Sequence, residues 1–240
     1  MKISDLSKNV QASWRGLIED QVPQQFKTCL QYCYNQKVID EKPIVYDIGA
    51  NCGNFTKLVR KFMPGSEVIG FEAFDFHKQV HDFFEFRTYF VGLSNVNEKR
   101  RFYFGENEAD IRSNVGNGNS YYKENKEISR SNTSYENSVE IQCYRLDDFK
   151  ESNNLPDPDI VKIDVQGAEK DVILGGINTI KKAKILFLEL PFVEYNIGAP
   201  KREEIIDILK FLGFSRNQEI NKTPYDADYI FFRDDVELMN

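Results

Sequence analysis

Four carboxylates stand at or near the ends of short apolar runs, where a parallel sheet would bring them together. These acids are Asp47, Glu72, Asp164 and Glu189. The carboxyl ends of parallel strands meet at one edge of a sheet, and open α/β sheets bind their ligands at that edge. Two close carboxylates that face a partly dry pocket raise the pKa of one of them, which suits a general base. The chain therefore carries the residue types needed for proton abstraction.

Asp164 and Glu189 are the leading candidates for the base, because they end two successive predicted strands. Glu169 stands about one turn into the helix after Asp164 and can reach the same space. Lys162 can orient a carboxylate or stabilise a developing oxyanion, although its alternation with Ile163 can also point it elsewhere. Asp164 and Glu189 can instead bind Mg²⁺, which would acidify a hydroxyl. Since no compact cluster demands a metal, the favoured hypothesis has no metal ligands.

The segment 43–63 places the first acid beside a turn that contains two glycines. Residues 44–48 are typical of a strand buried on both faces, and residues 55–63 follow helical spacing. Gly49 and Gly53 allow a tight turn and a close approach to a ligand. Their spacing, G-x-x-x-G, differs from the G-x-G-x-x-G of dinucleotide sites. The string D-I-G-A-N-C-G resembles motif I of the class I S-adenosylmethionine (SAM) methyltransferases.

Glu72 points to the same cofactor independently. It ends the second predicted strand about 20 residues beyond the glycine turn, where an acid can accept hydrogen bonds from both ribose hydroxyls of an adenosine group. A third predicted strand, 88–93, would bring Gly92 and Leu93 to the adenine edge. The implied SAM-binding residues are Asp47, Gly49, Ala50, Asn51, Gly53, Asn54, Phe55, Glu72, Ala73, Gly92, Leu93 and Asp164.

A second block, residues 143–176, carries the more specific resemblance. The strings R-L-D-D-F, V-K-I-D-V-Q-G-A-E and V-I-L-G-G, followed later by I-L-F-L-E-L, are similar to successive motifs of the FkbM family of SAM-dependent methyltransferases. With the glycine turn and Glu72, the resemblance extends over residues 43–233. One departure is Gln166, where that family more usually carries Glu. A role that needs a charge at this position does not carry over.

The resemblance implies transfer of the SAM methyl group to a hydroxyl oxygen of a sugar, a glycan or another small molecule. Such a transfer is an in-line displacement, so the enzyme has to hold the acceptor oxygen about 3 Å from the methyl group and remove its proton. An NAD(P)-dependent oxidoreductase is an alternative that the glycine spacing disfavours. A non-catalytic SAM-binding protein is a second alternative, and the acceptor is not written in the sequence.

The two histidines and four cysteines carry weaker signals. His77 and His81 lie four residues apart on a predicted helix that buries Val80, Phe83 and Phe84. The pair has the spacing of two metal ligands, but no H-E-x-x-H accompanies it, so a solvated or supporting role is favoured. The cysteines are few and scattered, which is typical of reduced, buried thiols.

Composition limits the partners. The chain has 240 residues and a formal net charge of -7, which disfavours a nucleic-acid backbone as the main partner. Apolar runs fall short of the roughly 18 residues that a membrane span requires, and the N-terminus lacks an apolar signal-peptide core. The prediction is a cytoplasmic protein that acts on a small-molecule or carbohydrate acceptor.

Alternating strand and helix patterns predict an α/β fold with a doubly wound, seven-stranded, mostly parallel sheet. Residues 1–42 are predicted to form an N-terminal helical extension that covers the sheet edge or the mouth of the site, or makes a homodimer contact. Residues 43–240 are predicted to form one methyltransferase domain. Within it, residues 105–138 interrupt the α/β pattern and are expected to form a lid over the acceptor.

Overall fold

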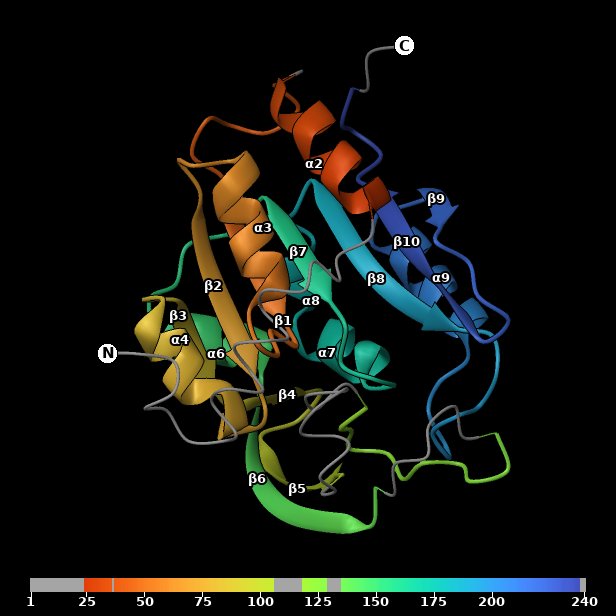
Figure 1. Cartoon of the computed structure of the whole chain (residues 1–240). Helices are drawn as coiled ribbons and strands as arrows, with labels where there is room; N and C mark the ends of the chain where they lie inside the picture. The colour runs from red at the N-terminus through yellow and green to blue at the C-terminus, as the bar shows by residue number, and fades with distance from the viewer. Residues whose placement is uncertain (1–23, 36, 106–117, 129–134, 238–240) are drawn as a thin grey trace.

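The computed structural model of the chain describes residues 24–35, 37–105, 118–128 and 135–237 (Figure 1). Its main sheet has seven strands in the order β3-β2-β1-β7-β8-β10-β9. Neighbours from β3 to β8 are parallel, and β10 is antiparallel to both β8 and β9. These strands are β1 (Ile44–Ile48), β2 (Glu67–Glu72), β3 (Arg87–Phe90), β7 (Ile160–Ile163), β8 (Ile185–Pro191), β9 (Arg216–Ile220) and β10 (Asp226–Phe232). The predicted fold class is confirmed, including the antiparallel strand in the closing hairpin.

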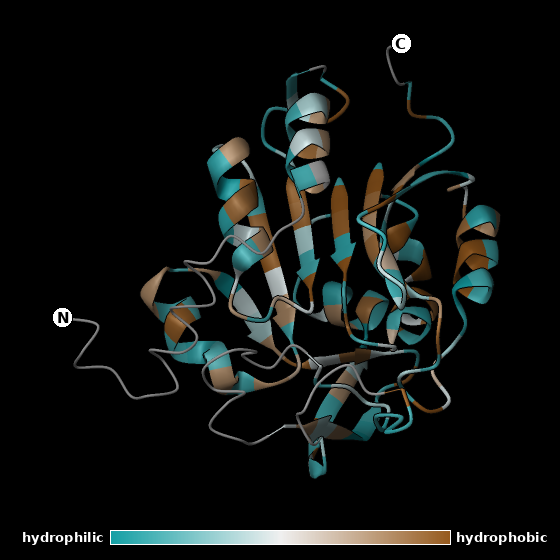
Figure 2. Cartoon of the chain, turned by 45° about the vertical axis from the view of Figure 1, so that its right-hand side comes forward, coloured by the Kyte–Doolittle hydropathy of each residue, from teal (hydrophilic) through white to brown (hydrophobic). Residues whose placement is uncertain are grey.

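Helices cover both faces of this sheet (Figure 1). One face packs against α2 and α3, and the other against α6, α7, α8 and α9, so that two hydrophobic clusters flank the strands. The bounds are α2 (Gln24–Asn35), α3 (Asn54–Phe62), α6 (Leu146–Ser152), α7 (Glu169–Gly175), α8 (Ile177–Ile180) and α9 (Arg202–Phe211). Figure 2 shows the central strands as largely hydrophobic, with mixed colouring on the outer helices. Burial of the strands on both faces explains why their sequences read as continuous apolar runs.

The alternation of side chains decides which polar residues share a face of the sheet. Ile160 and Phe187 belong to the cluster beneath α2 and α3. Since side chains alternate along a strand, Lys162 and Glu189, two residues further on, point to this same face. The strand register then places Asp47 beside Lys162, and Asp228 opposite Glu189. One face of the sheet thus carries a row of charged groups at its carboxyl edge.

The predicted strand over residues 88–93 is wrong in its length, because the chain changes sheets near Val91. The first part, β3, pairs with β2, whereas β4 (Gly92–Ser94) pairs in parallel with β6 (Asn137–Arg145) of a second sheet. That sheet has the order β4-β6-β5, with β5 (Glu98–Phe104) antiparallel to β6. It lies below the carboxyl ends of the main strands in Figure 1. The second sheet therefore borders the edge at which ligands of this fold bind.

The N-terminal extension and the lid are described only in part. Of the helix predicted within residues 1–42, residues 24–35 form α2, whose Phe26, Leu30 and Cys33 pack in the same cluster as Val45 of β1. The rest of that segment up to residue 23 lies outside the described residues. Of the predicted lid, residues 106–117 and 129–134 also lie outside them. The domain boundary at residue 42 and the lid stay predictions.

Candidate active site

A cavity of about 520 Å³ lies at the carboxyl edge of the main sheet. This volume is within the range of about 300 to 1,000 Å³ that is usual for small-molecule and cofactor sites. The loop after β1, the tip of β2 and the residues after β7 form one side. Residues of the second sheet, the segment 118–124 and the ends of β8 and β10 close the other. The cavity thus joins elements that are distant in sequence.

Most of the predicted SAM-binding residues line this cavity. They are Gly49, Ala50, Asn51, Asn54, Phe55, Glu72, Ala73, Leu93 and Asp164. Phe71, Val91 and Phe102 add an apolar wall that would suit an adenine ring. Asp47, Gly53 and Gly92 are predicted SAM-binding residues that do not line the cavity.

The glycine turn packs so closely against its neighbours that a side chain at either glycine would collide with them. Gly49 has a φ of 77°, and a Cβ at this position would collide with the carbonyl of Asp164 after β7. Gly53 has a φ of 92°, and a Cβ there would collide with the ring of Phe86. The amides of Gly49 and Ala50 both donate to the carbonyl of Phe71, at 2.9 and 3.0 Å. The turn therefore lies close against the ends of both β2 and β7.

Glu72 binds this turn as well as facing the cavity. Its Oε2 accepts a hydrogen bond from the amide of Asn51 at 2.8 Å, and its Oε1 accepts one from the amide of Phe74 at 3.0 Å. Burial raises the pKa of Glu72 above its ordinary value, although these two amide bonds oppose the shift. A carboxylate oxygen can accept a second hydrogen bond, so both remain available to ligand hydroxyls.

His81 supports the same turn, in keeping with the supporting role that was one of its two predicted roles, although the sequence did not indicate its partners. Both histidines are buried in the short helices η2 (Asp75–His77) and α4 (Lys78–Phe83), which excludes the solvated alternative of the prediction, and Phe83, predicted to be buried, is exposed. The Nε2 of His81 donates to the carbonyl of Asn51 at 2.6 Å, and its Nδ1 accepts from the hydroxyl of Thr88 at 2.7 Å. Burial lowers the pKa of His81, which favours this neutral form.

Lys162 is held between the turn and two carboxylates. Its Nζ donates to the carbonyl of Gly49 at 2.7 Å and lies 3.3 Å from Asp164 Oδ2 and 3.5 Å from Asp47 Oδ1. Burial alone would lower the pKa of Lys162, but the charges of Asp164 and Asp47 outweigh it and raise the pKa. Asp47 is fully buried, and its Oδ2 accepts from the hydroxyl of Thr56 at 2.7 Å. Asp47 therefore acts behind the cavity wall by holding this cation.

Gln166 joins the two acids that were predicted to lie together. Its Nε2 donates to Asp164 Oδ1 and to Glu189 Oε2, both at 2.9 Å. Burial raises the pKa of Glu189 well above its ordinary value, and the neighbouring Asp164 adds to the shift. The structure thus brings Asp164, Glu189 and Lys162 to one cavity. Gln166 contributes two hydrogen bonds there instead of a charge.

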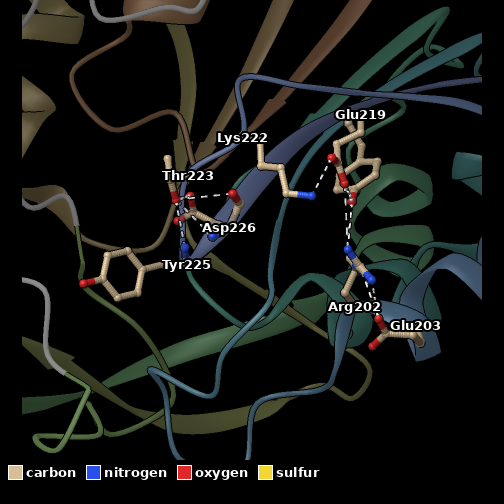
Figure 3. A network of polar contacts seen from close by, with 8 residues as sticks. Arg202, Glu203, Glu219, Lys222, Thr223, Tyr225 and Asp226 are labelled. Carbon is tan, nitrogen blue, oxygen red and sulfur yellow. Dashed lines mark hydrogen bonds and ion pairs between the residues drawn. The ribbon is translucent and has the colours of Figure 1, made fainter.

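Asp228 is a further acid of the cavity lining, absent from the sequence prediction. It lies opposite Glu189 in the β8–β10 pair, and its Oδ2 accepts from Asn221 Nδ2 at 2.7 Å. Burial raises the pKa of Asp228 to about 6, although the bond from Asn221 opposes the shift. The adjoining β9–β10 turn is fixed by a bond from the Thr223 hydroxyl to Asp226 at 2.6 Å (Figure 3).

Glu169 lies outside the cavity, which argues against its predicted catalytic role. The residue is only 2% exposed, and its carboxylate accepts hydrogen bonds from the amides of Val165 and Gly167 at 3.0 to 3.1 Å. Burial raises the pKa of Glu169 to about 7, against the effect of these amide bonds. Its carboxylate instead fixes the loop that carries Gln166.

The sheet order, the glycine turn and the acid at the tip of β2 together define a class I SAM-dependent methyltransferase fold. The family model described as "Methyltransferase FkbM domain" matches residues 47–216, and the chain belongs to this family. It is therefore a methyltransferase, and family and fold imply the use of SAM. The oxidoreductase alternative does not hold.

Two curated relatives carry names of sugar-modifying or O-methylating enzymes. The 2-O-methyltransferase NoeI of Sinorhizobium fredii is 25% identical over 172 residues, which cover 70% of this chain and 71% of NoeI. The hexuronic acid methyltransferase AglP of Haloferax volcanii is 29% identical over 101 residues, which cover 42% of this chain and 38% of AglP. A candidate O-methyltransferase from Klebsiella pneumoniae, 11% identical with a TM-score of 0.50, covers 97% of this chain and 90% of its own. This last likeness shows the fold.

The described residues contain neither a membrane-spanning helix nor a cluster of metal-ligating side chains. None of the helices there combines the length and apolar character that crossing a membrane requires. In the same part of the chain, no three His, Cys, Asp or Glu side chains are grouped so that they could hold a metal ion.

Proposed function

We propose that the chain transfers the methyl group of SAM to a hydroxyl oxygen of a saccharide, with Glu189 as the general base. The names of NoeI and AglP support an O-methyl transfer and a sugar acceptor. The observation that carries the assignment is the Glu189 carboxylate, which lines the cavity and has a raised pKa. A base is most effective when its pKa lies near the working pH.

The cofactor would lie against the turn after β1, with its ribose hydroxyls at Glu72 and its adenine against the apolar wall of Phe71, Val91 and Phe102. When bound, SAM supplies an electrophilic methyl group on a sulfonium sulfur. Asp164, whose Oδ2 lies 3.3 Å from the ammonium group of Lys162, provides a carboxylate near this end of the cavity. The same face of the sheet therefore holds the cofactor and the acids that act on the acceptor.

In the transfer, an oxygen–carbon bond forms to the acceptor as the sulfur–carbon bond breaks, and the bonding electron pair returns to sulfur. Glu189 takes the proton of the acceptor hydroxyl. Its Oε2 is engaged by Gln166, which leaves Oε1 to receive that proton. The amide of Gln166 fixes the carboxylate in one orientation, which shortens the search for a reactive geometry.

Incubation with methyl-labelled SAM and a panel of methyl glycosides tests the proposal, with mass spectrometry to detect the labelled product. Glu189→Gln should lower kcat by about 10² to 10⁴ and leave SAM affinity near the wild-type value. Glu151→Gln, an exposed position on α6, is the matched control. Full activity of Glu189→Gln would show that the base lies elsewhere, and SAM binding without transfer to any saccharide would favour a binding protein.

EDTA treatment separates this mechanism from the metal alternative. A base made only of protein groups predicts unchanged transfer after chelation. Activity that is lost with EDTA and restored by Mg²⁺ would assign activation of the hydroxyl to a metal instead.

A further inference from the structure

Glu189 and Asp228 line the side of the cavity where the proposed acceptor would bind, here called the acceptor side. No cationic side chain of the described residues contacts these two acids. Lys162 is the one cationic side chain among the described residues that line the cavity. Its ammonium group contacts Asp47, Asp164 and the carbonyl of Gly49. Glu189 and Asp228 receive hydrogen bonds from the neutral amides of Gln166 and Asn221. Ionising these two acids therefore leaves a net negative charge facing the acceptor.

The strand register makes this charge costly to maintain. Asp228 and Glu189 are cross-strand partners in the antiparallel β8–β10 pair. Like charges directly opposite one another destabilise such a pair, and burial adds to the cost. A positive group in the cavity would relieve both effects, whereas another carboxylate would increase them. The electrostatics of the site thus favour positively charged over negatively charged ligands, whatever their shape.

Glu124, whose backbone forms a bridge with that of Asn196, is a further acid of the lining, and neutral polar groups form the rest of this side. Asn119, Tyr195 and Asn196 line the cavity together with Asn221. The Oδ1 of Asn119 is buried and has no hydrogen-bond partner among the described residues, so it can accept a bond from a ligand. Amide and phenol groups of this kind match a ligand rich in hydroxyl or amine groups. The lining is therefore suited to a polyhydroxylated molecule without a negative charge.

We propose that Asp228, together with Glu189, selects the acceptor by charge, so that the cavity takes a neutral or amine-bearing saccharide and rejects a uronic acid. This inference rests on the proposed saccharide methylation and narrows its substrate class. An acceptor without a negative charge would distinguish this chain from AglP, which is named for a hexuronic acid. Asp228 acts here as a specificity-determining residue, because its carboxylate faces the acceptor without taking the proton.

The test compares saccharides that differ only at C6: a methyl hexoside, its 6-amino-6-deoxy form and its uronide, each in the gluco, galacto and manno configurations. Each charged compound is measured both as an acceptor and as a competitor of the neutral hexoside, so the result does not depend on which hydroxyl is methylated. The wild-type protein should bind the amine at least about tenfold more tightly than the uronide, as expected for a charge a few ångströms away. Asp228→Asn should reduce this ratio by about tenfold. Asp207→Asn, an exposed position on α9, should leave it unchanged.

Three results would contradict the inference in different ways. A wild-type preference for the uronide, with transfer to saccharides intact, would overturn the charge selection and leave the proposed function standing. An unchanged ratio in a folded Asp228→Asn protein would remove Asp228 from the assignment. Absence of transfer to every saccharide would overturn the proposed function and this inference with it. If Asp228→Asn does not fold, the wild-type comparison alone decides the charge selection.

Discussion

Replacing Glu72 tests whether this acid binds the ribose of the cofactor or only braces the turn after β1. Each of its oxygens already accepts one backbone amide, from Asn51 at 2.8 Å and from Phe74 at 3.0 Å. Each oxygen therefore has one further acceptor position, which gives two positions for two ribose hydroxyls. A hydrogen bond to a charged group contributes roughly 1.5 to 3 kcal/mol. Glu72→Ala should thus weaken cofactor binding tenfold or more.

The loss of the two amide bonds also disturbs the turn, so a single affinity is not sufficient. Calorimetry with S-adenosylhomocysteine and with its 2′,3′-dideoxy analogue forms a double-mutant cycle in which this disturbance cancels. If Glu72 binds the hydroxyls, Glu72→Ala should cost the natural ligand at least about 1.5 kcal/mol more than the analogue. Glu67→Ala, at the exposed start of the same strand, should change neither affinity. Equal losses for the two ligands would refute ribose binding and leave Glu72 as a brace of the turn.

Two further predictions concern groups that act from behind the cavity. His81→Leu removes the donor to the Asn51 carbonyl, so SAM affinity measured by calorimetry should fall about three- to tenfold while kcat at saturating SAM stays within about twofold; an unchanged affinity would contradict this. Glu169 has a folded-state pKa of about 7 against an ordinary 4.5, so its folded form retains a proton that the unfolded chain releases, and the free energy of unfolding should fall as the pH rises between these values. In Glu169→Gln, the free energy of unfolding obtained from denaturant titrations should fall by up to about 3 kcal/mol less across that pH window than in the wild type. An identical pH dependence in the two proteins would exclude this origin.

Local patterns were sufficient to predict the parts of the site that lie next to a strand end. Asp47, Glu72 and Asp164 each follow an apolar run, and the spacing of Gly49 and Gly53 indicated the turn between β1 and α3. These signals are local because the direction of a parallel strand alone decides which end faces the ligand. The seven-stranded sheet could be predicted for the same reason.

Contacts between distant segments could not be predicted in this way. Asp228 reaches the cavity only because β10 pairs with β8 in one particular register, and a shift by one residue would turn its side chain to the other face. The role of His81 depends on Asn51 and Thr88, which lie on different elements. Glu169 had the correct spacing to reach the cavity, but three nearby amide contacts hold it elsewhere. Sequence spacing gives the position of a residue but not its hydrogen-bond partners.

Gln166 shows how one neutral residue can connect the two halves of the site. Its φ of 54° is in the left-handed region, and its carbonyl accepts hydrogen bonds from Ser120 at 2.6 Å and from Asn196 at 2.7 Å. With the backbone fixed in this way, its side-chain amide can direct one N–H to Asp164 and the other to Glu189. A carboxylate at this position would offer no donor and would add a third negative charge to the pair. Glutamine therefore links Asp164, which contacts Lys162, to Glu189, whose pKa is raised, so two neighbouring acids can take different roles.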